Sequence, residues 1–510
     1  MHPSPGPGAT DKGLKDGALG LFSSTVIGLA STAPAYSLAA TLGVIAGIVG
    51  HQSPIVIILA FVPMFLIAYG YKELNRADPD CGTTFTWASR AFGPHTGWLG
   101  GWGIVAADII VMANLAQIAG AYGFQLVGAD GLAQDTFWVT VVGVAWIAVM
   151  TLVCYIGIEI SANLQKVLLT IEIVVLFLLA ITALVKVYGG TAPSVSSELS
   201  GSWFNPFRID SLDDLTKSVL AGVFIYWGWD TAVSVNEETV DRDRTPGHAA
   251  VISTITLLLV YLMVTTSAQA FAGVGDRGIG LANPDNSDDV LSSLGAEVFG
   301  TAGWGEVATK LLILMVLTSA AASTQTTILP SARTALSMAT FKAVPDRFAR
   351  IHPRFLTPTW STVGMGLASI AFYVMLTRVS GNVLADSIGS VGLVIAFYYG
   401  LTGFACVWYY RRVLTRRPHD LWTKGVMPAL GGVLLLYFFV NACVVYSAAD
   451  YGSTSWTLPF PPRRQLGGVF VTGIGALLLG AVLMLAYQVI RPAFFHKETI
   501  PVSAYERDGR

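Results

Sequence analysis

Long apolar runs separated by short polar loops dominate this sequence. From Gly17 to Tyr71 it contains no Asp, Glu, Lys or Arg. About twenty apolar residues span the hydrocarbon core of a bilayer, so this stretch is long enough for two crossings with a turn at residues 50–54. The same pattern predicts twelve membrane-spanning helices, over residues 18–49, 54–72, 97–127, 136–157, 160–187, 214–238, 248–274, 303–334, 358–378, 385–411, 425–449 and 466–490.

Two of the predicted helices are interrupted at matching places. Residues 23–34 contain small, hydroxyl-bearing and Pro residues, and residues 224–231 contain Gly228 and Asp230. Such residues weaken a helix and leave backbone groups without intrahelical partners. That is costly in lipid unless the freed groups line a cavity and bind a ligand. A matched pair of broken helices therefore indicates the binding site of a secondary transporter.

The composition supports a membrane protein. The chain is 53% hydrophobic and 12% charged, whereas a soluble protein is about 25% charged. A net charge of −2 with scattered basic residues gives no reason to expect nucleic acid binding. The four Cys lie far apart and lack metal-ligand spacing, and the His residues fall in loops, at helix ends or in the N-terminal tail. We therefore expect no metal site, no cofactor, no catalytic residues and no enzyme activity.

Basic residues gather in alternate loops, and such loops stay on the cytoplasmic side of a membrane. Lys and Arg cluster after the second, eighth and tenth predicted helices and near both chain ends, whereas the segment 275–302 is acidic. Arg463 and Arg464 are exceptions, on a loop expected outside. Both termini are therefore expected in the cytoplasm, and the protein is expected to be a multi-pass protein of the cytoplasmic membrane.

Helix count and loop charge also divide the chain. The first five helices and the next five form two sets whose leading helices cross the membrane in opposite directions, which is an inverted-topology repeat. The expected units are a disordered cytoplasmic N-terminus (1–16), a first five-helix repeat (17–190), a second five-helix repeat (191–411), two additional helices (412–490) and a cytoplasmic C-terminal tail (491–510).

Three groups of motifs resemble a known family. They lie at residues 71–102 (YKEL, then RAFGP and GWLGGW), 228–246 (GWD, then EE and RTP) and 331–358 (SAR, then VPDRF and TP). Together they resemble the amino acid–polyamine–organocation superfamily over roughly residues 15–410. Members of that family often carry Gly-Ser-Gly in the first helix, where this chain has Gly28-Leu29-Ala30-Ser31.

The resemblance implies an all-α membrane protein with the leucine-transporter fold, in which helices 1 and 6 are broken, and secondary active transport of amino acids or amines. It implies that substrate lies at mid-membrane against Ile27, Gly28, Leu29, Ala30, Ser31 and Thr32 of the first helix and Tyr226, Trp227, Gly228, Trp229 and Asp230 of the sixth. The half-helix beginning near residues 30–32 can offer N–H groups and a positive dipole end to a carboxylate. The ends of the first halves can offer carbonyls to an ammonium.

Three acids fall deep inside predicted helices without an evident basic partner, namely Asp108, Glu172 and Asp230. An ionisable residue inside the membrane is a functional candidate by default. Asp230 and Asp108 are candidates for proton coupling or for binding an amine. The alternatives are that Asp230 caps a helix beginning at Thr231 and that Asp108 hydrogen-bonds to a neighbouring helix. For Glu172 we favour a structural role.

Hydroxyls and aromatic rings supply further candidates. Ser319 and Ser323 in the eighth helix can bind sodium with carbonyls of the first helix, as in sodium-coupled members of this fold, or can bond within their own helix. Aromatic residues at the second interruption can wall off substrate or simply pack. Tyr398 and Tyr399 are weaker candidates of the same kind.

We therefore expect an amino acid permease that works by alternating access, coupled to protons or by exchange. A permease for polyamines or other organic amines is the nearest alternative, and a sodium-coupled amino acid symporter is another. Asp108 with Asp230 would favour a dication without a carboxylate, whereas a free amide cluster in the first helix would favour an amino acid. The expected partners are a small-molecule substrate, a proton or sodium ion, and the lipid bilayer.

Overall fold

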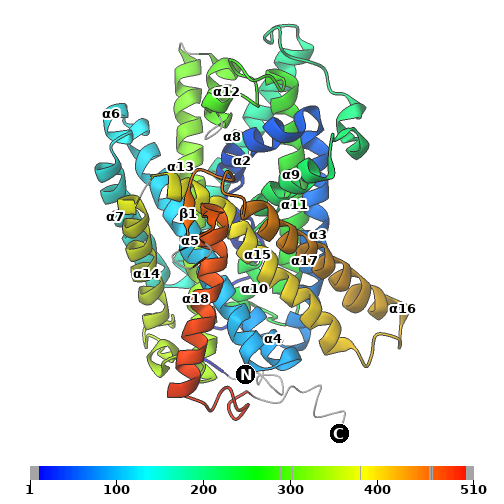
Figure 1. Ribbon diagram of the computed structural model, residues 1–510. Helices are drawn as coiled ribbons and strands as arrows, with labels where there is room; N and C mark the ends of the chain where they lie inside the picture. The colour runs from blue at the N-terminus through cyan, green and yellow to red at the C-terminus, as the bar shows by residue number, and fades with distance from the viewer. Residues whose placement is uncertain are drawn as a thin grey trace.

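The computed structural model describes residues 11–286, 290–300, 303–379, 381–458, 461 and 463–500, apart from the side chains of 381–385. This part of the chain is a helical bundle with one small hairpin (Figure 1). The helices of the first half are α1 (Leu21–Ser31), α2 (Pro34–Val49), α3 (Ser53–Ala77), α4 (Thr84–Phe92), α5 (Pro94–Leu126), α6 (Asp130–Ala133), α7 (Thr136–Ile156), α8 (Ile158–Tyr188), α9 (Leu212–Ile225) and α10 (Thr231–Ser234). Those of the second half are α11 (Thr245–Ala272), α12 (Val290–Phe299), α13 (Trp304–Thr340), α14 (Thr359–Val379), α15 (Gly381–Tyr410), α16 (Pro418–Asp420), α17 (Met427–Tyr446) and α18 (Gly468–Ile490).

The all-α membrane class is confirmed. In the described chain, ten helical stretches are long and apolar enough to cross a membrane, and the first of them, Leu21–Ala77, comprises α1, α2 and α3. The predicted helix bounds lie within a few residues of most observed ones. The sequence pattern missed α4, α12 and the hairpin of β1 (Ser455–Thr457) and β2 (Gln465–Gly467). The count of twelve crossings and the inverted repeat stay predictions.

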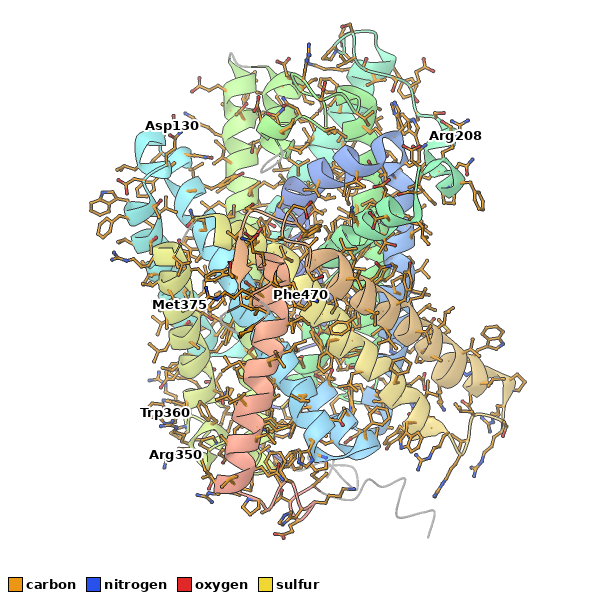
Figure 2. The ribbon with its side chains drawn as sticks, viewed as in Figure 1. Asp130, Arg208, Arg350, Trp360, Met375 and Phe470 are labelled. Carbon is orange, nitrogen blue, oxygen red and sulfur yellow. The ribbon has the colours of Figure 1, made fainter. Side chains whose placement is uncertain are left out.

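The surface of the bundle fits a lipid environment. Large apolar side chains such as Leu178, Val444 and Leu483 are exposed on the long helices α8, α17 and α18, as expected for residues that face lipid rather than water. Figure 2 shows charged Arg350 at one end and Asp130 and Arg208 at the other, with Met375 and Phe470 between them.

Both ends of the described chain lie at the same end of the bundle, here called the terminal end (Figure 1). Lys12 pairs there with Asp80, and Phe494 packs against Phe85. The expectation of disorder for residues 1–16 is wrong where the structure describes them, because Lys12 is buried between carboxylates. The rest of that tail, residues 1–10, and residues 501–510 of the C-terminal tail lie outside the described residues.

The end of α1 meets the segment that joins α9 to α10, and the start of α10, inside the bundle. The Oγ of Ser31 lies 2.8 Å from Oγ1 of Thr231. Gly228 has a φ of +117°, and a Cβ at this position would lie 2.7 Å from the carbonyl oxygen of Ser31. Glycine is required there both for the left-handed backbone and for the close approach.

Candidate functional site

The first interruption lies between α1 and α2. The helical turn of α1 continues past Ser31, because the N–H of Thr32 donates to Leu29 O and that of Ala33 to Ala30 O, both at 3.2 Å. Ala33 then takes a left-handed conformation, with φ of 45°, and α2 begins at Pro34. The expected free N–H groups near residues 30–32 are therefore not found; the N-terminus of the second half lies later.

The first amides of α2 are already engaged. Pro34 has no N–H, the amide of Ala35 donates to Glu172 Oε1 at 2.6 Å, and that of Tyr36 donates to Ser319 Oγ at 3.2 Å. The Ser319 hydroxyl donates to the same Glu172 oxygen at 2.7 Å. A negative group at a helix N-terminus satisfies the free amides and the helix dipole together. Here the protein's own carboxylate, on α8, supplies that group.

Neighbouring helices also satisfy carbonyls at both interruptions. The Ser323 hydroxyl donates to Ser31 O at 3.1 Å, and the Tyr261 hydroxyl of α11 donates to Ile225 O at 2.6 Å. Ser319 and Ser323, the two serines predicted to bind sodium, thus donate their hydroxyl protons to protein acceptors. A sodium site stays a prediction.

The second interruption lies between α9 and α10 and contains Asp230. This residue holds the N-cap position of α10, but its side chain makes no capping hydrogen bond. Instead it accepts a hydrogen bond from Tyr399 of α15 at 2.7 Å and a longer one, at 3.5 Å, from Tyr398. The capping alternative is therefore wrong, and tertiary contacts with α15 hold the carboxylate. Tyr398 and Tyr399, weak candidates from sequence, are its direct partners.

Aromatic side chains enclose Asp230. The Trp227 indole donates to the Tyr398 hydroxyl, and Trp229 packs with its ring centroid 5.1 Å from those of both Tyr71 and Tyr399. The Trp229 Nε1 is buried and has no hydrogen-bond partner within the described chain. The second interruption therefore contains the Asp230 carboxylate and a donor without a partner in the described chain, Trp229 Nε1, both surrounded by aromatic rings.

Asp108 on α5 lies near this group. Its carboxylate accepts a hydrogen bond from the Ser331 hydroxyl of α13 and interacts electrostatically with Asp230. The hydrogen bond to a neighbouring helix matches the alternative stated for Asp108. Asp108, Glu172 and Asp230 are all buried, and in the parts of the chain that the structure describes none of them forms an ion pair with Lys, Arg or His.

The predicted substrate residues of both interruptions are buried as one group, and their contact with substrate stays a prediction. They are Ile27, Gly28, Leu29, Ala30, Ser31 and Thr32 with Tyr226, Trp227, Gly228, Trp229 and Asp230. Sequence reasoning missed the contact of Glu172 with α2 and the bond from Tyr261. No local sequence pattern predicts these two contacts, because both depend on how separate helices pack.

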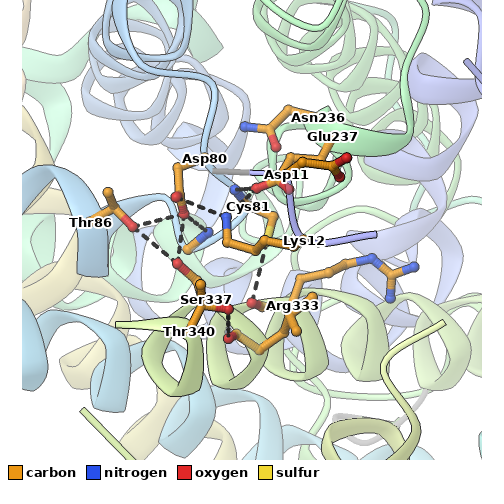
Figure 3. Close-up of polar contacts among 12 residues, drawn as sticks. Asp11, Lys12, Asp80, Cys81, Thr86, Asn236, Glu237, Arg333, Ser337 and Thr340 are labelled. Atoms are coloured by element: carbon orange, nitrogen blue, oxygen red, sulfur yellow. Dashed lines mark hydrogen bonds and ion pairs between the residues drawn. The ribbon is translucent and has the colours of Figure 1, made fainter. Parts of the chain in front are cut away.

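A second group of polar side chains lies at the terminal end (Figure 3). This terminal cluster consists of Lys12, Asp80, Cys81, Glu237, Glu238, Arg333 and Ser337. The Lys12 Nζ lies 2.8 Å from Asp80 Oδ2 and also bonds to Glu237. Arg333 binds Glu238 with two parallel hydrogen bonds, of 2.7 and 2.8 Å. The side chains of these pairs are 0–7% exposed, so solvent screens them little.

The charge balance of the terminal cluster favours ionised Lys12 and Asp80, whereas burial raises the pKa of Glu237 despite the attraction of Lys12. Burial alone would raise the pKa of Asp80, but the Lys12 ammonium outweighs it and holds that pKa at about 2. Burial lowers the pKa of Lys12, yet Asp80 and Glu237 raise it well above its ordinary value. Just outside the cluster, burial outweighs the attraction of Arg90 and raises the pKa of Asp78 to about 6.

Three residues of the terminal cluster have the composition of a metal site. The ligand atoms of Asp80, Cys81 and Glu237 lie within 4.8 Å of one another. However, the Lys12 ammonium bonds to both carboxylates, and burial raises the pKa of the Cys81 thiol well above its ordinary value. A metal needs the thiolate, so the ammonium takes the place of a cation and we assign no metal here.

Comparison with known proteins gives a consistent result. A family model described as amino acid permease matches residues 19–488. The mitochondrial cationic amino acid transporter 3 of Arabidopsis thaliana is 25% identical over 67% of this chain, and the match spans only 54% of that relative. An uncharacterized transporter of Mycobacterium tuberculosis is 27% identical over 75% of this chain and 78% of its own length. The low-affinity putrescine importer PlaP of Escherichia coli is 20% identical over 83% of this chain and 88% of its own length.

Proposed function

The chain belongs to the amino acid permease family, and from this premise we propose that it is a secondary transporter of cationic amines, either basic amino acids or diamines. One observation carries the proposal: three carboxylates are buried at or near the helix interruptions with no cationic partner in the described chain. Buried charges are stable only when paired or hydrogen-bonded. A substrate ammonium would supply the missing positive charge.

The state of the two interruptions separates the candidate substrates. The α-carboxylate of any amino acid needs free amides, and the first amides of α2 already bond to Glu172 and Ser319, so binding depends more on the positive charge of the substrate. A cation needs carboxylates, and Asp230 and Asp108 are both present. The balance therefore moves from an amino acid of unspecified charge, as expected from the sequence, toward a cationic substrate. The printed names of two relatives, a cationic amino acid transporter and a putrescine importer, support the same direction.

The proposed cycle is alternating access in a twelve-crossing inverted repeat with both termini in the cytoplasm. Substrate binds with its ammonium against Asp230, and the segments of the two interrupted helices, with α3 and α11, rock against α5, α7, α13 and α14. Release at the terminal end requires the terminal cluster to open. Protonation of Asp230 or Asp108 would remove the charge that holds the ammonium, which couples transport to protons. We propose protons rather than sodium because Asp230 and Asp108 are buried acids, and each carboxylate can take up a proton.

The test is uptake into proteoliposomes of labelled lysine, ornithine, putrescine and leucine, with and without an imposed proton gradient. We expect the cations to accumulate with the gradient and leucine not to. Asp230→Asn should lower cation uptake by about 100-fold, because a hydrogen bond to a charged group contributes about 1.5–3 kcal/mol and 1.4 kcal/mol corresponds to tenfold.

The matched control is Asp386→Asn. Asp386 is another buried acid of α15, but it accepts a hydrogen bond from the Ser453 amide at 2.6 Å, away from the interruptions. This variant should keep uptake if it folds, which its melting temperature reports. Uptake of leucine alone, or full pH-dependent uptake by Asp230→Asn, contradicts the proposal.

A further inference from the structure

We infer that Glu172 determines specificity: its carboxylate takes the place of a substrate carboxylate at α2, so the protein prefers amines without an α-carboxylate over the parent amino acids. The inference rests on the proposed function and narrows it. It also assigns Glu172 a role that the sequence did not favour.

Glu172 and its neighbours occupy the N-terminus of α2. Glu172 is fully buried, and its Oε1 accepts from the Ala35 amide at 2.6 Å and from the Ser319 hydroxyl at 2.7 Å. Tyr36 uses its amide on Ser319, and the amide of Ser37 donates to Ala33 O at 2.8 Å. Since Pro34 has no N–H, every amide of the first turn of α2 that could bind a carboxylate is in use.

The charge of Glu172 disfavours a second carboxylate at α2. One helix N-terminus offers about half a positive charge, which favours one carboxylate and not two. A substrate carboxylate beside Glu172 would meet a like charge in a buried place with no base in ion-pair contact in the described chain. Two close carboxylates disfavour each other's ionisation. A substrate carboxylate would therefore have to displace Glu172 or remain unbound.

Glu172 also has an acceptor atom without a hydrogen-bond partner in the described chain. The second carboxylate oxygen of Glu172, Oε2, is buried and has no hydrogen-bond partner in the described chain. A buried acceptor without a partner loses free energy of desolvation that a donor would restore. An ammonium is such a donor and also neutralises the charge. The group that fits Glu172 is thus a second cation, not a second carboxylate.

The position of Glu172 places this acceptor near both interruptions. Tyr261 interacts electrostatically with Glu172, and its hydroxyl bonds to Ile225 O at the end of α9. Glu172 contacts α2 from α8, whereas Asp230 is held by α15. Two carboxylates supported by different helices suit a substrate with an ammonium at each end, and diamines have that form.

The experiment compares pairs that differ only in the α-carboxylate: putrescine with ornithine, and cadaverine with lysine. Uptake of each is measured in proteoliposomes for the wild type, Glu172→Ala, Glu172→Gln and Glu159→Ala. Glu159 lies on the same helix, is exposed and pairs with Lys15, so it controls for loss of a carboxylate on α8. We expect the wild type to prefer the diamine in both pairs.

Glu172→Ala should free the α2 amides and shift the diamine-to-amino-acid ratio toward the amino acid by about tenfold, the effect of one modest interaction. Glu172→Gln should shift it less, because the amide oxygen still accepts from Ala35 but has no charge. Glu159→Ala should leave the ratio unchanged. If the alanine variant does not fold, the glutamine variant decides, with ligand-induced change in melting temperature for putrescine and ornithine as the measure of binding.

A wild type that takes up the amino acids better than the diamines overturns this inference and leaves the proposed function standing. So does a ratio that stays within about twofold in both Glu172 variants. A wild type that takes up none of the four cations overturns the proposed function and this inference with it.

Discussion

The buried acids of the terminal cluster and those at the helix interruptions have opposite surroundings. Asp80, Glu237 and Glu238 are each bonded to Lys12 or Arg333. Asp108, Glu172 and Asp230 are also buried, yet their hydrogen bonds come from hydroxyls and backbone amides. Buried carboxylates are thus stabilised by cations in the terminal cluster and by neutral hydrogen-bond donors at the interruptions.

This difference in pairing indicates different roles for the two regions, closure of the terminal end for one and binding of a cation for the other. An acid that already has its cation gains nothing from a ligand, but breaking the pair is costly, so the terminal cluster holds two parts of the chain together. An acid held only by neutral donors keeps its charge available. We therefore infer that the terminal cluster holds the terminal end closed and that the carboxylates at the interruptions bind a cation.

The largest expected effect is from Lys12→Ala. Removal of one partner from a buried ion pair costs about 3–5 kcal/mol, and here it leaves both Asp80 and Glu237 without their ammonium. The terminal end should open more often. Cys81, buried in the cluster with its amide donating to Glu237 at 2.9 Å, is a built-in reporter, so its maleimide labelling should rise strongly in a background where Cys154, Cys406 and Cys443 are Ser.

The control is Lys15→Ala, three residues further along. Lys15 pairs with Glu159 at 2.6 Å, but both side chains are exposed, and an exposed pair contributes about 0–1 kcal/mol. It should label like the parent. Equal labelling of Cys81 in both variants would mean that the terminal cluster does not hold the end closed.

Asp78 gives an intermediate case, with a smaller effect that depends on pH. Burial raises its pKa to about 6 although Arg90 is beside it. A carboxyl whose pKa is raised in the folded state contributes stability that is full below about pH 4 and is lost as the pH rises through 6. One pKa unit corresponds to about 1.4 kcal/mol, so the loss is about 2–3 kcal/mol.

The measurement is the melting temperature in detergent at pH 5 and pH 7.5. Between pH 5 and pH 7.5, the melting temperature of Asp78→Asn should fall less than that of the wild type. Asp80→Asn should be less stable at both values by a similar amount, because the pKa of Asp80 is about 2 and its stabilising effect is lost only as the pH falls below about 4. An unchanged slope in Asp78→Asn would exclude Asp78 as the titrating group.

The membrane class and most helix bounds could be predicted because they follow from apolar run length, which is local. Both interruptions were expected because Pro34, Gly228 and Asp230 change the backbone or its charge where they stand. Helix α12 lay hidden in a segment that looked like an acidic loop. The prediction also treated Lys12 as a flanking charge, because nothing near it in sequence reveals carboxylates 68 and 225 residues away.

The site shows the same limit. Sequence singled out Asp230 correctly as a buried acid beside an interruption, but assigned its side chain a possible capping bond that the structure does not have. It placed the free amides near residues 30–32, whereas α2 begins at Pro34 and its amides bond to Glu172 from another helix. Partners that come from separate helices are set by packing, and a single sequence gives no measure of it.

Loss of one tyrosine hydroxyl beside Asp230 should have only a small effect on transport. Tyr399 donates to its carboxylate at 2.7 Å, whereas Tyr398 lies at 3.5 Å, the limit of a hydrogen bond. A typical hydrogen bond contributes about 0.5–1.5 kcal/mol, so Tyr399→Phe should raise the KM for a cationic amine by roughly 2–10-fold. Tyr398→Phe should raise it less.

Tyr373→Phe is the matched control, since this tyrosine on α14 donates to Gln117 at 2.8 Å, a bond of the same length elsewhere in the bundle. It should leave KM unchanged while lowering the melting temperature as much as Tyr399→Phe does. If all three variants behave alike, the tyrosines act only on folding and Asp230 needs no support from α15. If Tyr399→Phe alone raises KM, the substrate binds the Asp230 carboxylate. That carboxylate is then held in place by a neutral donor and not by a cation of the protein.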